Sequence, residues 1–267
     1  MFRRPRESAP SQAASRLAQI LEPFPVLMWG PLALNYLGVP IVVGIHIIVV
    51  RNEDYESSIQ KLHNSGFLET APCRSPPPEI LETLPDPQAV LDEINRNYKK
   101  LDQSTTTFNY PDYYENKEQL ILIPNSFAHL PIEPVTIVSS ETKIVTSISL
   151  FGESPIINQY DVYDNLSYPH ENILVYSFMK AALDDENNTA ITLWGEELRA
   201  WISMMVGYLD INNACVDGCL DENVVEWFSI HFGRKHEATF GPMNRRITKR
   251  LGSGREIMVD MRGDPIL

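Results

Sequence analysis

The stretch that most constrains the fold is the apolar run GVPIVVGIHIIVV at residues 38–50. A run of this length that is rich in Val and Ile predicts a strand buried on both faces, as in a parallel or mixed sheet covered by helices. Gly44 and His46 interrupt the run two residues apart, so a strand would place them on one face. The run is too short to cross a bilayer, and we expect no membrane-spanning helix and no membrane partner.

Helix and strand signals alternate through the first half of the chain. Pro31 suits the first turn of a helix, where a missing N–H is harmless, and Gly38 suits the end of that helix. Acidic residues follow the buried run and a glycine closes the next helical segment, as expected of a capped helix. The spacing predicts helices at 11–22, 31–38, 52–67 and 88–101 and strands at 24–30, 118–124 and 143–151.

The second half of the chain becomes helical from about residue 171. Ile191, Trp194, Leu198, Trp201 and Met205 form one apolar stripe at helical spacing. We therefore predict an α/β fold with a mainly helical C-terminal part. The expected organisation is a disordered arm at 1–11, an α/β domain at 12–155, a helical region at 156–240 and a basic tail at 241–267.

The formal net charge of −13 is distributed unevenly along the 267 residues. Residues 234–267 carry eight Lys and Arg against four acids, whereas the rest of the chain carries 14 basic and 31 acidic residues. Such a tail suits a phosphate-rich partner, and the alternative is that it docks on the acidic body of its own chain. The residues that we expect to contact nucleic acid are Arg245, Arg246, Lys249 and Arg250.

Three cysteines give no disulfide framework, and an odd number is typical of a reducing compartment. Cys215 and Cys219 are four residues apart, but no second Cys or His pair follows at zinc-site spacing. The N-terminal arginines have no apolar run behind them that could form the core of a signal peptide. We expect free thiols, no metal site and a cytoplasmic protein.

The order of strand, Gly30, short helix, LGVP, buried strand and a helix ending in SGF resembles the start of the nucleotidyltransferase fold, over about residues 12–68. In that family the glycine helps to seat the triphosphate, and the next strand bears Asp-x-Asp or Glu-x-Asp, whose carboxylates hold two magnesium ions. In this chain Gly44 and His46 stand where the two acids belong, and residues 120–123 offer no third acid. The resemblance implies a nucleotidyltransferase-like mixed sheet without metal ions, cofactor or nucleotidyl transfer. A generic α/β unit is the alternative.

His46 is flanked by Ile45, Ile47 and Ile48. A histidine in such apolar surroundings is more often a buried, hydrogen-bonded side chain than a catalyst, and a lone imidazole is a poor magnesium ligand. We therefore expect His46 to be buried and structural.

The segment WGPLALNYLGVPIVV also resembles a group of filamentous-fungal proteins, many of them encoded near secondary-metabolite genes. One enzyme family to weigh here is the fungal arginine-containing cyclodipeptide synthases, which take aminoacyl groups from charged tRNAs and carry an essential Asp-Asp-x-x-Glu motif. The nearest match in this chain is LDDENN. Asp184 and Asp185 are in place, Asn188 stands where the Glu is expected, and Glu186 is its nearest substitute.

The enzyme hypothesis is therefore a fungal secondary-metabolism transferase, a tRNA-dependent arginine-containing cyclodipeptide synthase that uses aminoacyl-tRNA, arginyl-tRNA in particular. Its chemistry needs no metal, because an aminoacyl ester is already activated and the attacking amine needs only a base. Asp184, Asp185 and Glu186 are the predicted catalytic residues. Two alternatives stay open. Residues 184–188 could form an inter-helix loop with a helix cap, or the chain could be a catalytically inactive nucleotidyltransferase-like binding module that acts through a protein partner.

Overall fold

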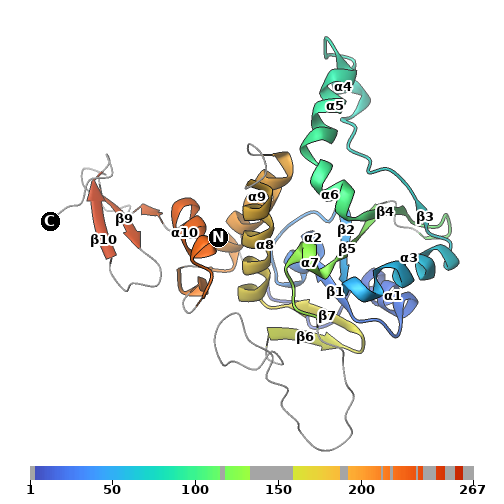
Figure 1. Ribbon diagram of the computed structural model, residues 1–267, viewed down its shortest axis with the longest axis horizontal. Helices are drawn as coiled ribbons and strands as arrows, with labels where there is room; N and C mark the ends of the chain where they lie inside the picture. The colour runs from blue at the N-terminus through green and yellow to red at the C-terminus, as the bar shows by residue number, and fades with distance from the viewer. Residues whose placement is uncertain are drawn as a thin grey trace, which may run out of the picture.

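The chain folds around a seven-stranded mixed sheet with helices on both faces, and Figure 1 shows this arrangement in a computed structural model. The structure describes residues 4–114, 118–132, 159–186, 192–211, 213–216 and 219–232, together with the backbone of strands at 234–236, 245–249 and 256–260. The strand order of the large sheet is β3-β4-β5-β2-β1-β7-β6. The predicted α/β class with a mixed sheet is thereby confirmed at that level.

The central strand β2 and its neighbours β5 and β1 come from apolar segments that the sequence predicts as strands. β2 pairs in parallel with β5 and antiparallel with β1, and β1 pairs in parallel with β7. The remaining pairs of the large sheet are antiparallel. The strands are β1 (Val26–Trp29), β2 (Ile45–Val50), β3 (Leu68–Glu69), β4 (Thr106–Asn109), β5 (Gln119–Pro124), β6 (Tyr160–Tyr163) and β7 (Leu166–Pro169).

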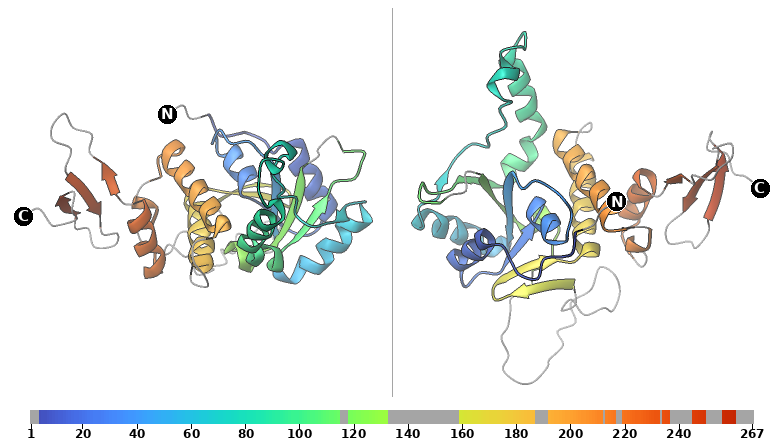
Figure 2. Two further views of the ribbon diagram at one scale, coloured as in Figure 1. Left: turned by 90° about the horizontal axis from the view of Figure 1, so that it is seen from above. Right: turned by 180° about the vertical axis from the view of Figure 1, so that it is seen from behind.

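Helices cover the sheet in two groups, as Figures 1 and 2 show from three directions. Contacts place α1 and α3 on one face and α2, α7, α8 and α9 on the other. The helices are α1 (Gln12–Leu21), α2 (Pro31–Tyr36), α3 (Tyr55–Asn64), α4 (Pro78–Leu81), α5 (Pro87–Asn97), α6 (Lys99–Ser104), α7 (Asn125–Ala128), α8 (Glu171–Glu186), α9 (Leu193–Tyr208) and α10 (Glu222–His231). Short 3-10 helices lie at Asn52–Asp54 and Asn213–Val216.

The described part of the C-terminal segment forms a small antiparallel sheet beyond α10 (Figure 1). Its strands are β8 (Arg234–His236), β9 (Arg245–Lys249) and β10 (Glu256–Asp260), with β9 in the middle. No helix within the described residues is long and apolar enough to cross a membrane.

Two expected boundaries differ from the observed fold. The predicted helix at 88–101 is split into α5 and α6 at Tyr98. β6 and β7 lie beyond residue 155 yet complete the large sheet, so the helical region expected from 156 begins only at α8. Both strands are four residues long and mixed in polarity, which leaves too little periodicity to identify them from sequence. The strand expected at 143–151 lies outside the described residues.

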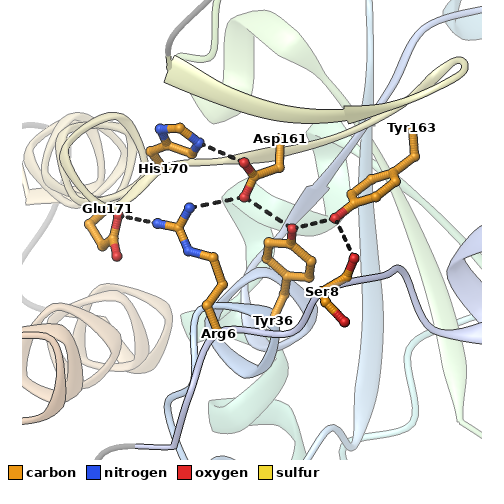
Figure 3. Close-up of polar contacts among 7 residues, drawn as sticks. All are labelled: Arg6, Ser8, Tyr36, Asp161, Tyr163, His170 and Glu171. Carbon is orange, nitrogen blue, oxygen red and sulfur yellow. Dashed lines mark hydrogen bonds and ion pairs between the residues drawn. The ribbon is translucent and has the colours of Figure 1, made fainter.

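Residues 4–11, expected to belong to a disordered arm, lie against the sheet-and-helix body instead. The backbone N–H of Glu7 donates to the Tyr36 carbonyl at 2.9 Å. The Arg6 guanidinium pairs with Asp161 at 3.0 Å and with Glu171 at 2.6 Å (Figure 3). Asp161 also accepts a hydrogen bond from the Tyr36 hydroxyl at 3.0 Å. This polar cluster fixes the arm on β6 and α8 through groups that the sequence alone could not pair.

Candidate functional site

A cavity of about 350 Å³ lies between the sheet and helix α9. Its floor is made by Ile45 and Ile47 of β2 and Ile121 of β5. Leu193 and Trp194 from the first turn of α9 form one wall. The other wall is formed by side chains of α5, α6 and the proline-rich loop, which is the segment at 70–77 between β3 and α4. The volume lies at the lower end of the range for small-molecule sites, and the mixture of apolar walls with a few polar groups is typical of such sites.

The apolar floor follows from the register of two parallel strands. Ile47 lies opposite Ile121, and Ile45 lies opposite Gln119. Because alternate residues of a strand share a face, the same face of β2 presents Ile45 and Ile47 together. The branched side chains that favour the strands therefore also make the floor of the cavity.

The face of β2 that carries Ile47 contacts the start of α2 at Gly30. Its φ of +59° lies in the region that favours glycine. A Cβ added there would lie 3.0 Å from Cδ1 of Ile47 and 3.0 Å from Cη2 of Trp201. The glycine is required because the chain turns sharply against β2 and α9 at this point.

The positions that face Gly30 differ from those expected from the sequence. The resemblance placed Gly44 and His46 where metal-binding acids belong, but Gly44 precedes β2 and the His46 side chain contacts Tyr110, on the opposite face of the sheet from Ile47. The side chain that reaches Gly30 is that of Ile47. The sequence does not show where the apolar run enters the sheet, and a strand register that differs by one residue exchanges the two faces.

His46 is buried, as predicted, with 6% of its surface exposed. Its Nδ1 lies 2.6 Å from the Tyr110 hydroxyl. Burial lowers the pKa of His46, and the charge of Glu118 opposes this shift. These contacts describe a neutral imidazole that holds β2 to the segment after β4.

The polar groups of the cavity lie on its outer side, and two of them contact each other. The Tyr98 hydroxyl donates to Oε2 of Glu197 at 3.1 Å. Burial raises the pKa of Glu197, and the charge of Arg74 opposes this shift. The pKa of Tyr98 is also raised, first by burial and then by the neighbouring carboxylate. Glu197 is therefore a carboxylate in surroundings that disfavour its charge.

The other polar groups of the cavity are engaged with protein partners. Arg74 donates two hydrogen bonds to Asp102, at 2.5 and 2.7 Å, and its Cζ lies 4.1 Å from the centre of the Tyr98 ring. Gln119 accepts from the Cys73 N–H at 2.7 Å and donates to the Ala71 carbonyl at 3.2 Å. These contacts position the proline-rich loop as the outer edge of the cavity.

The predicted catalytic carboxylates lie at the end of α8, and none of them lines the cavity. Asp185 is 2% exposed and accepts a hydrogen bond from the Thr192 hydroxyl, which also caps α9. A Cβ on Gly195 would lie 2.7 Å from Oδ2 of Asp185, so α8 and α9 approach closely here. Asp185 therefore links α8 to α9.

Asp184 and Glu186 have different partners from Asp185. Oε1 of Glu186 accepts from Nε of Arg199 at 3.2 Å and from the Trp227 indole at 2.9 Å, which links α8 to α9 and α10. Oδ2 of Asp184 lies 2.9 Å from Nε2 of His129, and the Asp184 side chain is 42% exposed. The three carboxylates thus contact three separate groups, and their catalytic role stays a prediction.

The other expected site residues are described only in part. Arg245, Arg246 and Lys249 lie on β9, of which the backbone alone is described, whereas Asn188 and Arg250 lie outside the described residues. Contact of this segment with nucleic acid stays a prediction. Within the described residues no group of three or more His, Cys, Asp or Glu side chains is arranged to hold a metal ion.

Sequence reasoning missed the polar side of the cavity. One signal was present, because Glu197 follows Trp194 by three residues and precedes Trp201 by four, so it lies on the apolar stripe of its helix. A carboxylate on such a stripe is a candidate for a buried function. Arg74 and Tyr98 gave no comparable signal, since they are separated by 23 residues that include α4 and α5, and their contact depends on tertiary packing.

Comparisons with protein families, with curated proteins and with solved structures found no match to this chain. The described residues form an α/β fold with a mixed seven-stranded sheet. A functional proposal therefore depends on the geometry of the cavity and its surroundings.

Proposed function

We propose that the chain is a nucleotidyltransferase-like binding module without nucleotidyl-transfer activity, and that it takes a small ligand in the cavity between β2, β5 and α9. The observation that carries the proposal is the floor of that cavity. Ile45, Ile47 and Ile121 occupy the face beside Gly30, where a nucleotidyltransferase of this topology would need carboxylates. Magnesium ions require oxygen ligands, which three aliphatic side chains do not provide.

A preformed wall supports ligand binding. Trp194 packs against Trp29 and Trp201, with ring centres 6.0 and 5.6 Å apart. The Trp29 indole in turn donates to the Ser177 hydroxyl at 2.7 Å, which anchors the aromatic group to α8. Because these rings pack against one another, ordering the wall costs little free energy when a ligand enters the cavity.

The first experiment addresses nucleotidyl transfer. The unmodified chain is incubated with Mg²⁺, each labelled nucleoside triphosphate and a mixture of RNA, protein and small-molecule acceptors. We expect no incorporation of label, because the cavity floor lacks oxygen ligands. Magnesium-dependent incorporation that disappears when Ile47 is replaced by Trp would contradict the proposal.

The second experiment addresses binding and uses 4-phenylbutanol as a neutral apolar probe in isothermal titration. Leu193 lines the cavity and is 44% exposed, so Leu193→Trp should narrow the entrance without disturbing the core. Leu220 is 81% exposed and does not line the cavity, which makes Leu220→Trp the matched control. We expect the probe to bind the unmodified chain and the control but not Leu193→Trp. Equal binding to all three would place the probe elsewhere and contradict the proposal.

The second candidate function is the tRNA-dependent cyclodipeptide synthase. It is favoured by the pair of Asp184 and His129, in which a partly exposed carboxylate lies 2.9 Å from an imidazole nitrogen. Such a pair could take a proton from an attacking amine. Asp184→Asn should then lower the product measured by mass spectrometry in an expressing host by about 10²-fold or more, with an unchanged melting temperature. Full yield from this variant would remove the carboxylate from the reaction.

A further inference from the structure

We infer that the cavity selects a hydrophobic amine, whose ammonium group pairs with Glu197 while its apolar body lies on Ile45, Ile47 and Ile121. This inference rests on the proposed function, because it assigns a chemical class to the ligand of the same cavity. It follows from the charges that the polar side of the cavity presents.

The cationic group of the cavity is already neutralised. Both terminal nitrogens of Arg74 donate to the Asp102 carboxylate, and its guanidinium lies over the Tyr98 ring. A bidentate pair of this kind uses the planar edge that would otherwise recognise a carboxylate or phosphate ligand. An anionic ligand would therefore meet a guanidinium whose charge Asp102 already balances.

The carboxylate of the cavity is not neutralised in the same way. Tyr98 donates one hydrogen bond to Glu197, through Oε2. Among the residues that the structure describes, no Lys, Arg or His lies within ion-pair distance of Glu197. A carboxylate in a mostly apolar site is unfavourable unless a cation or further donors reach it. An ammonium group supplies both the charge and three donors.

The amide of Gln119 does not compete for this role. Its oxygen accepts from the Cys73 N–H, and its nitrogen donates to the Ala71 carbonyl and to Oδ1 of Asn109. Of the polar side chains that line the cavity, Glu197 and Tyr98 are thus the two that have hydrogen-bonding capacity left for a ligand.

The volume and shape of the cavity limit the size of the ligand. About 350 Å³ accommodates about a dozen heavy atoms if each takes the space of a water molecule, about 30 Å³. An aromatic or branched aliphatic body suits the three isoleucines and Trp194. The expected ligand is therefore a small amine with one apolar group, and not a nucleotide or a peptide.

The test compares two probes of nearly identical shape, 4-phenylbutylamine and 4-phenylbutanol, by isothermal titration at pH 7. On the unmodified chain we expect the amine to bind about 10-fold to 100-fold more tightly than the alcohol, the range for a hydrogen bond to a charged partner. Glu197→Gln keeps the size and the acceptor for Tyr98 but removes the charge, so the two probes should bind this variant equally.

The matched control is Glu196→Gln. Glu196 is the adjacent residue, but it is exposed and pairs with Arg199 on the outer side of α9. This variant should keep the full preference for the amine. If Glu197→Gln fails to fold, the comparison of the two probes on the unmodified chain still tests whether the cavity selects an amine, and equal binding overturns the inference.

The outcomes separate the two proposals. Equal binding of amine and alcohol to the unmodified chain, or a preference for the amine that survives Glu197→Gln, would overturn the inference and leave the binding module standing. Failure of both probes to bind the unmodified chain would overturn the inference together with the proposed function. Tighter binding of 4-phenylbutanoate, titrated as a third probe, than of the amine would also overturn the inference, because Arg74 and not Glu197 would then set the selectivity.

Discussion

Gly30→Ala should destabilise the fold by about 2–6 kcal/mol, because two penalties combine at this position. The backbone angles of Gly30, φ +59° and ψ −137°, lie in a region that is nearly restricted to glycine, and holding another residue there costs about 1–3 kcal/mol. The new methyl group would lie 3.0 Å from Ile47 and from Trp201, and forcing such contacts in a packed core adds about 1–3 kcal/mol.

The measurement is equilibrium unfolding in urea, followed by tryptophan fluorescence. With a slope of about 3 kcal/mol per M, the expected loss lowers the midpoint by about 1 M. Gly44→Ala is the matched control, because a Cβ at Gly44 meets nothing within 4 Å and its φ is not positive. The control midpoint should stay within about 0.3 M of the unmodified chain, since surface changes are usually within about 0.5 kcal/mol. A Gly30→Ala midpoint equal to that of the control would refute the packing of α2 against the cavity face.

Three further predictions concern charges. Because burial lowers the folded-state pKa of His46, the unfolded chain binds the proton first, and stability should fall as the pH drops below about 6.5. His46→Asn should lower the unfolding midpoint and flatten the dependence of that midpoint on pH relative to the unmodified chain. Burial raises the folded-state pKa of Glu197 beside Tyr98 and Arg74, so stability should fall as the pH rises from about 4.5 through the folded-state pKa. Glu197→Gln should remove this pH-dependent part of the free energy of unfolding, measured in urea titrations, and the variant should melt no lower than the unmodified chain at pH 7. If the basic segment contacts tRNA, charge reversal at Arg245, Arg246, Lys249 and Arg250 should weaken that binding and flatten its salt dependence in filter-binding assays; unchanged affinity would favour a solvated or self-docking segment.

Much of the secondary structure was predictable because it repeats a local pattern. The apolar runs of β2 and β5 and the stripe of α9 each contain enough apolar residues to define an element without tertiary information. The limits of β2 were not predictable, since Val42 belongs to the same apolar run and yet is 88% exposed. The sequence could not distinguish the extended residues before the sheet from the residues within it.

The candidate site was less predictable than the fold for the same reason. Asp184, Asp185 and Glu186 were predicted as catalytic residues because LDDENN is the nearest match to an Asp-Asp-x-x-Glu motif, but adjacent helical residues point in different directions and these three contact different neighbours. The residues that do share a cavity come from β2, β5, α5, α6, α9 and the proline-rich loop. Their proximity depends on long-range packing, which short motifs do not encode.

The measurement that tests the cavity most directly is the rate at which Cys73 reacts with a thiol reagent in the presence of 4-phenylbutanol. Cys73 lines the cavity and is exposed, whereas Cys215 is buried, and a Cys73→Ser variant gives the background from the other thiols. We predict a saturable slowing of the Cys73 reaction in the unmodified chain that is lost in Leu193→Trp. A rate that the probe leaves unchanged up to its solubility limit, in a folded chain, would contradict the assignment of the cavity as the ligand site.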